Sequence, residues 1–509
     1  MNKINPFFPL VALLAASSPL TAVTAAAPEQ RPNIIIVFTD DQGYTDLGIH
    51  GIDPDVRTPN IDQLARDGVL FTNGYVTAPQ CIPSRAGLIT ARHQNAFGVD
   101  DNLKGPLPHE ETTIAQRLRA VGYVTGMVGK WHLDVGRDAR NRPQFREDSL
   151  PHMHGFDEMF SGNMSRYHAT FDLQGNDLKK PFEVVVQEGY RVDIQTDAAL
   201  AFLDRRTGDD RPFFLYLGYF APHSPVQDPP EYMQRMAHVE ELVRRMGLAS
   251  ILAMDDGVGR IREKLKDMGV HDNTLIFFMS DNGAPLREGA YVGSLNHPLV
   301  GEKGMQTDGG QRIPYVGAWP GVIPPGQVFK LPVSTLDAAA TAIAAAGAPF
   351  DGKIEGVDLL PWLTGKETGP VHDELCWRWR SQSAILTGDG KWKFIRLGQR
   401  QRFLFDMTEI GRQTADDNLI RQHPEIAAQL EARLKAVADT WKIKGLPGDP
   451  AVRPDQNFYD QHVNQTLPPL PLDAGMTGAF LPIGEDSVPP PGGAINDPGS
   501  QRTKRPQRK

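Results

Sequence analysis

The sequence predicts an α/β fold built on a large, mainly parallel sheet with helices on both faces. Residues 33–39 and 274–280 form almost continuous runs of branched and aromatic side chains, which is typical of central strands covered on both faces. Further strands are expected at 123–128 and 213–217, and helical segments alternate with these strands. Strands that alternate with helices in this way pair in parallel through crossover connections.

The expected helices follow from their end signals and their apolar periodicity. The first has Thr58 as a predicted N-cap, Pro59 at its first position and Gly68 beyond its end, as helix termini prefer. The other helices are expected at 112–120, at 192–206 and, as a long amphipathic helix with a break near Gly247, at 230–268.

A second, smaller unit is predicted after residue 370. Four short strand-like runs suggest an antiparallel sheet, and a helix is expected to pack on it; the strands are at 374–379, 384–387, 392–396 and 402–405 and the helix at 424–443. The predicted organisation is a signal peptide at 1–27, a catalytic domain at 28–370, an α+β subdomain at 371–445 and an extension at 446–509. The extension is expected to be loop-rich and to end in a disordered basic tail.

The amino terminus has the layout of a secretory signal peptide. A short apolar run at 7–16 is followed by small residues at 22–27 and then by polar residues, with cleavage expected near the end of the small residues. The apolar run is too short to span a bilayer. Export to a bacterial periplasm or to the medium is therefore expected. The formal net charge of −9 argues against nucleic acid as the main partner.

The two cysteines, Cys81 and Cys376, are fewer than a disulfide-stabilised exported protein normally carries. A bridge between them stays open, although Cys376 lies in a predicted strand, where cysteine is commonly an inert core residue. Cys81 precedes Pro83, Ser84 and Arg85, which favour a helix that starts just after it. A helix N-terminus with a nearby arginine binds anions. A plain thiolate nucleophile is a further interpretation of Cys81.

Acidic and amide side chains follow both buried strands, as Asp40-Asp41 and as Asp281-Asn282. Because the carboxyl ends of parallel strands meet at one edge of a sheet, the two pairs are expected to lie together. They offer only oxygen ligands, which suit Ca²⁺ or Mg²⁺ better than a transition metal. Asp and Asn are also common in turns and helix caps, so the prediction of a metal site rests on the two pairs jointly.

The segment Cys81-Ile-Pro-Ser-Arg85, followed by Leu88-Ile-Thr90, resembles the signature of the type I sulfatases. Where that family often has Thr-Gly, this chain has Thr90-Ala91-Arg92, a departure outside the five-residue core. Further segments resemble the family in order and approximate spacing: residues 32–43, Thr58-Pro-Asn-Ile-Asp62, Phe71-Thr-Asn73, Gly129-Lys-Trp-His132, Ala221-Pro-His-Ser-Pro225, Ser280-Asp-Asn-Gly283, Gly301-Glu-Lys-Gly304, Gly356-Val-Asp-Leu-Leu-Pro361 and Leu404-Phe-Asp406.

The resemblance implies an alkaline-phosphatase-like sandwich and an arylsulfatase-type sulfuric ester hydrolase. It implies that a maturation enzyme oxidises Cys81 to formylglycine, that Arg85 holds the hydrated aldehyde, and that the reaction passes through a covalent sulfoenzyme. It also implies one Ca²⁺ ion, in preference to Mg²⁺, held by the modified residue 81 together with Asp40, Asp41, Asp281 and Asn282.

The remaining catalytic roles are implied for acidic, cationic and imidazole side chains. Asp281 would act as the base. Lys130 and Lys303 would bind the sulfate oxygens and offset the charge that develops in the transition state. His223 would protonate the leaving alcohol, assisted by Lys303, and His132 would take a proton from the second hydroxyl so that sulfate is expelled.

The expected substrate is a sulfated polysaccharide or its oligosaccharides, such as an algal galactan or a host glycosaminoglycan, so the expected process is polysaccharide degradation. Candidates for the substrate rim are Ser161, Ser165, Arg166, His168, Arg287, His297, Arg312, Trp377 and Trp379. Two alternatives stay open. The first is a formylglycine-dependent phosphonate or phosphate monoester hydrolase, and the second is a non-catalytic calcium-dependent protein that binds glycans.

Overall fold

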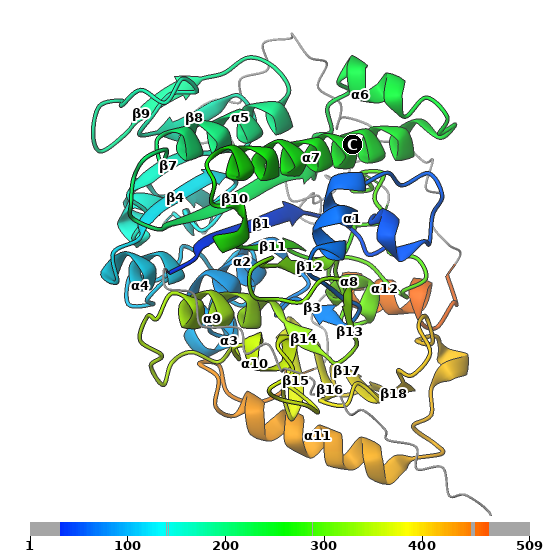
Figure 1. Ribbon diagram of the computed structural model, residues 1–509. Helices are drawn as coiled ribbons and strands as arrows, with labels where there is room; N and C mark the ends of the chain where they lie inside the picture. Colours follow the sequence, from blue (N-terminus) through cyan, green and yellow to red (C-terminus); the bar gives the residue numbers. More distant parts are fainter. Residues whose placement is uncertain (1–30, 139, 141, 288, 449–452, 468–509) are drawn as a thin grey trace, which may run out of the picture.

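The computed structural model describes residues 31–138, 140, 142–287, 289–448 and 453–467. The predicted signal peptide and the predicted basic tail lie outside these residues. Figure 1 shows a central sheet between two layers of helices, with a smaller sheet and helix α11 at the end of the molecule drawn in yellow and orange. No helix within the described ranges is long and apolar enough to cross a membrane.

The central sheet has ten strands in the order β13-β2-β12-β11-β1-β10-β4-β7-β8-β9. Its middle is parallel: β1 (Asn33–Asp40) lies between β10 (Phe213–Pro222) and β11 (Thr274–Ser280), and β4 (Val124–Gly129) and β7 (Glu158–Gly162) follow. This confirms the predicted mainly parallel sheet. Antiparallel pairing is confined to the flanks, which hold β12 (Tyr315–Ala318), β2 (Val69–Phe71), β8 (Arg166–Ala169) and β9 (Glu183–Val186), while β13 (Gln327–Phe329) pairs in parallel with β2.

The side chains of β1 alternate between two hydrophobic cores. Ile34 and Phe38 pack in one core and Ile35 and Val37 in the other, as the two-residue period of a strand requires. One core is completed by α2 (Cys81–Thr90), α4 (Ile114–Ala120) and α9 (Thr335–Ala345), and the other by α1 (Pro59–Arg66), α5 (Arg191–Asp204) and α7 (Leu242–Asp267). The two covered faces explain why the strand is apolar without a break.

Two helix predictions are corrected in detail. The segment predicted as one helix at 230–268 forms two helices, α6 (Pro230–Arg235) and α7, and the break lies before Leu242 rather than near Gly247. Glu241 ends the break because its carboxylate accepts the backbone N–H groups of Val243 and Arg244. Thr58 occupies the N-cap position of α1 but does not cap the helix, since its hydroxyl donates to Asp62 at 2.8 Å.

The predicted C-terminal sheet is confirmed. It is antiparallel throughout, with β15 (Glu374–Trp379), β16 (Gln382–Thr387), β17 (Trp392–Leu397) and β18 (Gln401–Asp406). Helix α11 (Pro424–Ala438) packs on it through Leu430 and Leu434. The other short elements are β3 (Gly74–Tyr75), α3 (Gln94–Phe97), β5 (Val135–Arg137), β6 (Pro143–Phe145), α8 (Asp308–Gln311), β14 (Val333–Ser334), α10 (Leu360–Leu363) and single-turn helices at Gly48–His50, Glu147–Ser149, Pro151–His154, His271–Asn273 and Ala415–Asp417.

A helix lies in the segment that was predicted to be loop-rich. Helix α12 (Arg453–His462) buries Phe458 and Tyr459 in the same core as Trp377. The helix is short and largely polar, so its sequence carries little apolar periodicity. The buried Lys393 links β17 of the C-terminal sheet to helix α8 of the larger part, because its ammonium lies 2.7 Å from Asp308 Oδ1. The C-terminal sheet is therefore joined to the catalytic part by polar as well as apolar contacts.

We expect the start of helix α9 to depend on a buried ion pair that weakens as the pH rises. His372 Nε2 lies 2.9 Å from Asp337 Oδ2, and the same carboxylate accepts the backbone N–H of Ser334 at 2.6 Å. Burial lowers the pKa of His372, but the charge and hydrogen bond of Asp337 outweigh burial, so this pKa lies above its usual value. A raised histidine pKa adds stability below the unfolded pKa of about 6.5, and that stability is lost as the pH rises through the folded pKa.

The free energy of unfolding of His372→Gln, measured by chemical denaturation, should therefore fall about 1 to 2 kcal/mol below that of the wild type at about pH 6. The gap should narrow steadily toward about pH 9, where the histidine has lost its charge. A gap that keeps the same size at every pH would contradict the ion pair.

Candidate active site

The predicted site residues lie at the carboxyl edge of the parallel strands. Asp40 is the last residue of β1, and Asp281 follows β11 directly. Cys81 is the first residue of α2, so the helix begins at the cysteine itself and not just after it. Lys130 follows β4, and His223 follows β10. Five segments that are far apart in the sequence therefore meet at one edge.

Cys81 is buried, with 1% of its surface exposed. Its Sγ atom lies 3.1 Å from Lys303 Nζ and 3.5 Å from Asp40 Oδ1. Burial and the negative charge of Asp281 raise the pKa of the thiol well above its usual value, although Lys130 and Lys303 oppose them. The thiol is therefore protonated at neutral pH, which disfavours the plain thiolate nucleophile. Neither cysteine forms a disulfide.

Three carboxylates converge on Cys81. Ligand atoms of Asp40, Asp41, Asp281 and Cys81 all lie within 4.8 Å of one another, and all four residues are buried. The backbone N–H of Asp41 donates to Asp281 Oδ1 at 3.2 Å. Asp41 adopts the left-handed backbone conformation, with φ of 65°, which an aspartate visits only at a cost in strain. This conformation is held by contacts to Asp281 and Lys303, and the two consecutive aspartates lie at one site.

Three cations balance these carboxylates. Arg85 contacts Asp281 Oδ2 through Nε at 3.0 Å and Nη2 at 2.8 Å. Lys130 forms an ion pair with Asp40, and Lys303 lies 2.6 Å from Asp41 Oδ1. We call these six residues, Asp40, Asp41, Asp281, Arg85, Lys130 and Lys303, the charge cluster. Its members are all buried, so each unpaired charge would carry a large desolvation cost.

Two carboxyl groups of the charge cluster have pKa values that are shifted in opposite directions. Burial would raise the pKa of Asp40, but Lys130 and the neighbouring cations outweigh burial and hold it well below its usual value. Burial and the charge of Asp40 raise the pKa of Asp281 to about 7, although Arg85 opposes the shift. Asp281 is therefore the member that can exchange a proton near neutral pH, which is the property of a general base.

Both predicted catalytic histidines lie beside the charge cluster. His223 Nε2 is 3.7 Å from Asp41 Oδ2, and its Nδ1 donates to the carbonyl of Ser224 at 2.6 Å. Burial lowers the pKa of His223 to about 4. His132 has φ of 62°, and its Nδ1 is buried with no hydrogen-bond partner among the described residues. Burial and then the charge of Lys130 lower its pKa well below the usual value.

The donor set fits a divalent cation of the hard type. Asp40, Asp41 and Asp281 supply carboxylate oxygens, and Asn282 supplies an amide oxygen. Asn282 Nδ2 donates to Asp41 Oδ1 at 2.6 Å, while its Oδ1 is buried and accepts no hydrogen bond from any described residue. A buried acceptor without a donor is costly, and a cation bound by Asn282 Oδ1 would remove that cost. Oxygen donors alone favour Ca²⁺ or Mg²⁺.

Several residues of the site neighbourhood were not found from the sequence. Tyr216 accepts a hydrogen bond from Arg85 at 3.2 Å, and Phe220 lies under His223 and Lys130, with its ring centroid 5.0 Å from the histidine ring and 4.8 Å from the lysine Nζ. Both residues belong to the apolar strand β10, where an aromatic residue looks like ordinary core.

Two candidates for the substrate rim turn out to be core residues. Trp377 and Trp379 are each 2% exposed, and Trp377 donates to the carbonyl of Val76 at 2.7 Å. A tryptophan buried in this way packs the fold and has no free face for a sugar ring. Arg312 is also buried, and it donates to the carbonyl of Thr72 at 2.7 Å. These contacts remove the three residues from the predicted rim.

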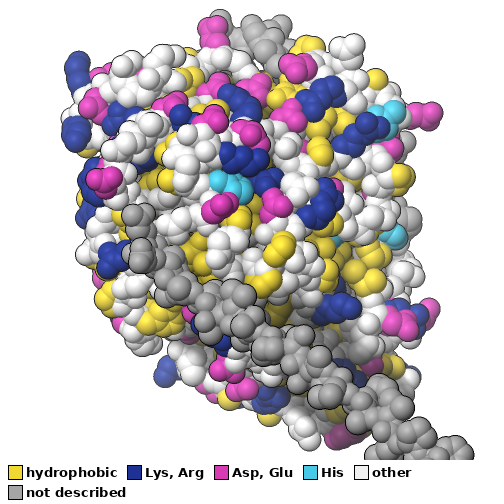
Figure 2. Space-filling model, in the orientation of Figure 1, with side chains coloured by type: hydrophobic (Ala, Val, Ile, Leu, Met, Phe, Trp, Pro, Cys, Tyr) yellow, Lys and Arg dark blue, Asp and Glu magenta, His cyan; other side chains and the backbone are white. Residues whose placement is uncertain are grey.

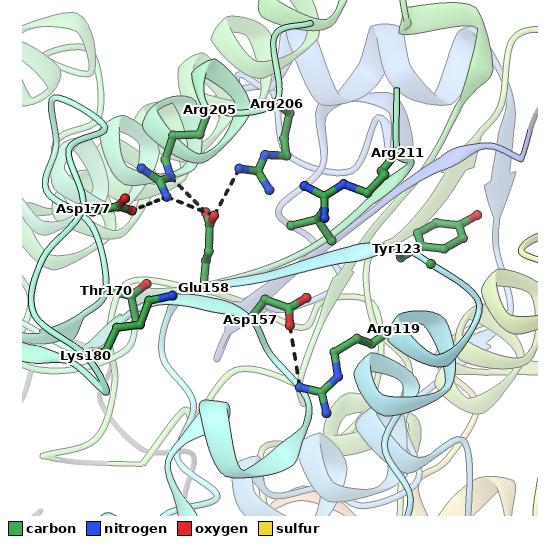
Figure 3. Close-up of a pocket in the computed structure, with 12 residues that line it drawn as sticks. Arg119, Tyr123, Asp157, Glu158, Thr170, Asp177, Lys180, Arg205, Arg206 and Arg211 are labelled. Atoms are coloured by element: carbon green, nitrogen blue, oxygen red, sulfur yellow. Dashed lines mark hydrogen bonds and ion pairs between the residues drawn. The ribbon is translucent and has the colours of Figure 1, made fainter. Parts of the chain in front are cut away.

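A pocket of about 460 Å³ lies at the opposite edge, where β4 and β7 begin. Figure 3 shows its arginines facing carboxylates: Arg205 and Arg206 contact Glu158, and Arg119 faces Asp157. Ion pairing neutralises these arginines, so they do not form an anion site like the one at Cys81. On the face drawn in Figure 2, basic and acidic side chains are likewise interspersed.

We expect Arg85→Met to destabilise the metal-free protein by about 3–5 kcal/mol at about pH 8, because it leaves the buried Asp281 carboxylate without its partner. A carboxyl with a raised pKa is least costly when protonated, so the loss should shrink as the pH falls below about 7. The double variant Arg85→Met with Asp281→Asn should recover much of the stability. Chemical denaturation in the presence of a chelator measures the free energy of unfolding of the wild type, of Arg85→Met and of the double variant. Equal stability of the single and double variants would contradict the ion pair between Arg85 and Asp281.

Comparisons with known proteins agree with this site. The family model for sulfatases matches residues 32–348. N-acetylgalactosamine-6-sulfatase of Canis lupus familiaris is 33% identical over 397 residues, which cover 72% of this chain and 72% of that protein. Arylsulfatase A of Homo sapiens is 34% identical over 415 residues, which cover 75% and 79%. The solved structure of Ps i-CgsB in complex with k-i-k-neocarrahexaose is 29% identical with a TM-score of 0.70, over 85% of this chain and 97% of that one. By its family model, its relatives and its fold, this chain belongs to the sulfatase family and is a sulfuric ester hydrolase.

Proposed function

We propose that this sulfatase removes sulfate from a sulfated carbohydrate and that residue 81 acts as formylglycine. The observation that carries the proposal is the position of Cys81, whose Sγ atom lies between Lys303 and the carboxylates of Asp40, Asp41 and Asp281. This position offers an anionic ester both cations and a nucleophile at one point. Carbohydrate as substrate is supported by the relatives, which include an N-acetylgalactosamine-6-sulfatase and a structure in complex with neocarrahexaose.

We propose that one Ca²⁺ ion is held by the oxygens of Asp40, Asp41, Asp281 and Asn282, beside residue 81. Sulfatases generally use a formylglycine and a divalent metal; together these would supply a hydroxyl nucleophile of lowered pKa and would neutralise charge on the sulfate. The charge cluster holds three carboxylates and three cations and is neutral by itself. A divalent ion would make the charge cluster net positive, which would favour binding of an anionic ester.

The cations of the charge cluster have separate tasks in this proposal. Arg85 orients residue 81 and also fixes Asp281, which it contacts through two nitrogens. Lys130 and Lys303 approach from the two sides of Asp40 and Asp41, where each would bind a sulfate oxygen. Asp281 would take the proton from the attacking hydroxyl, because its carboxylate lies beside residue 81 and is held there by Arg85.

In this proposal His223 donates the proton to the leaving alcohol, and Lys303 assists it. Burial keeps His223 neutral in the free enzyme, so it needs the nearby Asp41 and the anionic substrate to become charged. Burial alone would lower the pKa of Lys303, but Asp41 and its other neighbours raise it well above its usual value, so Lys303 stays protonated and can support the leaving oxygen. We assign to His132 the removal of a proton from residue 81 as sulfate departs.

The predicted signal peptide makes this a proposal for an exported enzyme, periplasmic or secreted. It requires a maturation enzyme that oxidises Cys81 to the aldehyde. Both Cys81 and the start of α2 are buried in the folded protein, so oxidation must precede completion of the fold.

Release of inorganic sulfate from a panel of defined sulfated oligosaccharides tests the function. The matured wild type should release sulfate over many turnovers from at least one of them, with phosphate and phosphonate monoesters as the comparison. Cys81→Ser should stop after at most one turnover, because a serine sulfate cannot expel sulfate by returning to an aldehyde. Sustained turnover by this variant would refute the formylglycine, and preference for the phosphorus esters would favour the alternative hydrolase.

We expect Ca²⁺ to stabilise the chelator-treated protein, because only the folded chain brings the oxygens of Asp40, Asp41, Asp281 and Asn282 together to bind it. At a concentration 100 times the dissociation constant the gain is about 2.7 kcal/mol, which a rise in the thermal unfolding midpoint will report. Asp41→Asn and Asn282→Leu should weaken the response, and Asp416→Asn, an exposed position, should not. An unchanged midpoint in the wild type would rule out the ion at this site.

A further inference from the structure

The loop that carries Lys303 is held from both sides by residues far along the chain. The matched sulfatase segment ends at residue 348, whereas the residues that touch the neighbours of Lys303 lie in β16 and α12. We propose that Gln382 and His462 are positioning residues that hold Lys303 against residue 81. This inference rests on the proposed role of Lys303 in binding the ester.

On the amino side of Lys303, Glu302 is fully buried. Its Oε2 accepts the backbone N–H groups of Leu286 at 2.9 Å and Arg287 at 3.2 Å. Its Oε1 lies 3.2 Å from His462 Nε2 on α12. The carboxylate therefore ties two loops together, and the helix supplies its third contact. Arg287 also lies over the ring of Phe458 on the same helix, at 5.1 Å.

On the carboxyl side of Lys303, Gln382 holds the backbone. Its Nε2 donates to the carbonyl of Gly304 at 2.8 Å, and its Oε1 accepts the N–H of Gln306 at 3.1 Å. The hydroxyl of Tyr459 on α12 donates to the same Oε1 at 3.0 Å. Gln382 and Tyr459 are both fully buried. The amide is thus fixed by α12 and in turn fixes the two residues on either side of Met305.

The position of Lys303 Nζ must be accurate for the proposed role. Lys303 Nζ must lie close to Cys81 Sγ and Asp41 Oδ1, and it does so at 3.1 and 2.6 Å. Catalytic groups that are displaced by about 1 Å can lose on the order of 100-fold in rate. The long lysine side chain adapts at its tip, so the loop backbone must supply the precision. The C-terminal sheet and α12 therefore position a catalytic side chain, and they do so through Gln382, Tyr459 and His462.

The test compares His462→Ala and the milder Tyr459→Phe with the wild type and with Gln456→Ala. Gln456 lies on α12 but bonds within the helix, to Asp460 at 2.8 Å, which makes it a matched control. Activity is normalised to the formylglycine fraction, measured by mass spectrometry of the peptide containing residue 81. His462→Ala and Tyr459→Phe should each lose about fivefold in kcat/KM, as expected for one lost hydrogen bond, whereas Gln456→Ala should match the wild type. His462→Gln, which keeps a donor, should recover most of the loss caused by His462→Ala.

The same variants are also made in protein that carries Lys303→Ala. This comparison separates an effect on the position of Lys303 from a general loss of stability. If the contacts act through Lys303, His462→Ala and Tyr459→Phe should change kcat/KM by less than about twofold in that background. A loss of the same size in both backgrounds would overturn the proposal.

Amide hydrogen exchange gives a readout that does not need activity. Residues 301–307 should exchange faster in His462→Ala and Tyr459→Phe than in the wild type, and Gln456→Ala should match the wild type. Unchanged exchange in both variants would also overturn the proposal. If the wild type releases no sulfate from any substrate, the proposed function fails, and the exchange experiment still decides whether α12 holds the loop.

Discussion

The mutual neutralisation of three buried carboxylates and three buried cations is the constraint on which the site depends. Asp40, Asp41 and Asp281 could not remain charged at the edge of a closed sheet without Arg85, Lys130 and Lys303. These side chains come from the end of β1, from α2 and from the segments after β4 and β11, so their ion pairs join parts of the chain that are far apart in the sequence. The same balance explains how residue 81 can lie at a buried site surrounded by six charged side chains.

The parallel strands supply the geometry that this balance requires. β1 and β11 run side by side in register, from Asn33 opposite Thr274 to Thr39 opposite Ser280, so the acidic pairs that follow them must meet. That juxtaposition is predictable from the sequence, because a continuous apolar strand that ends in carboxylates is a local signal. The central strands β1, β4, β10 and β11 and the C-terminal sheet are predictable because their strands show clear apolar runs, whereas the other strands of the central sheet, β2, β7, β8, β9, β12 and β13, were not predicted.

The remaining parts of the site carry no local signal. Lys130, His223 and Lys303 lie in loops where any polar residue is common, and only the resemblance to a family identifies them. Tyr216 and Phe220 look like core residues of β10. Helix α12 and Gln382 act through single hydrogen bonds, which leave no periodic pattern in a sequence. The break before Leu242 depends on one capping carboxylate, which is why its position was predicted incorrectly.

The central claim is that the aldehyde form of residue 81 is the species that works. The most direct measurement follows sulfate release in preparations that differ only in the fraction of formylglycine, obtained by varying co-expression of the maturation enzyme and quantified by mass spectrometry. The account predicts turnover that is proportional to the aldehyde fraction, with none in preparations that contain only the thiol. Full turnover by protein in which Cys81 remains a thiol would contradict it.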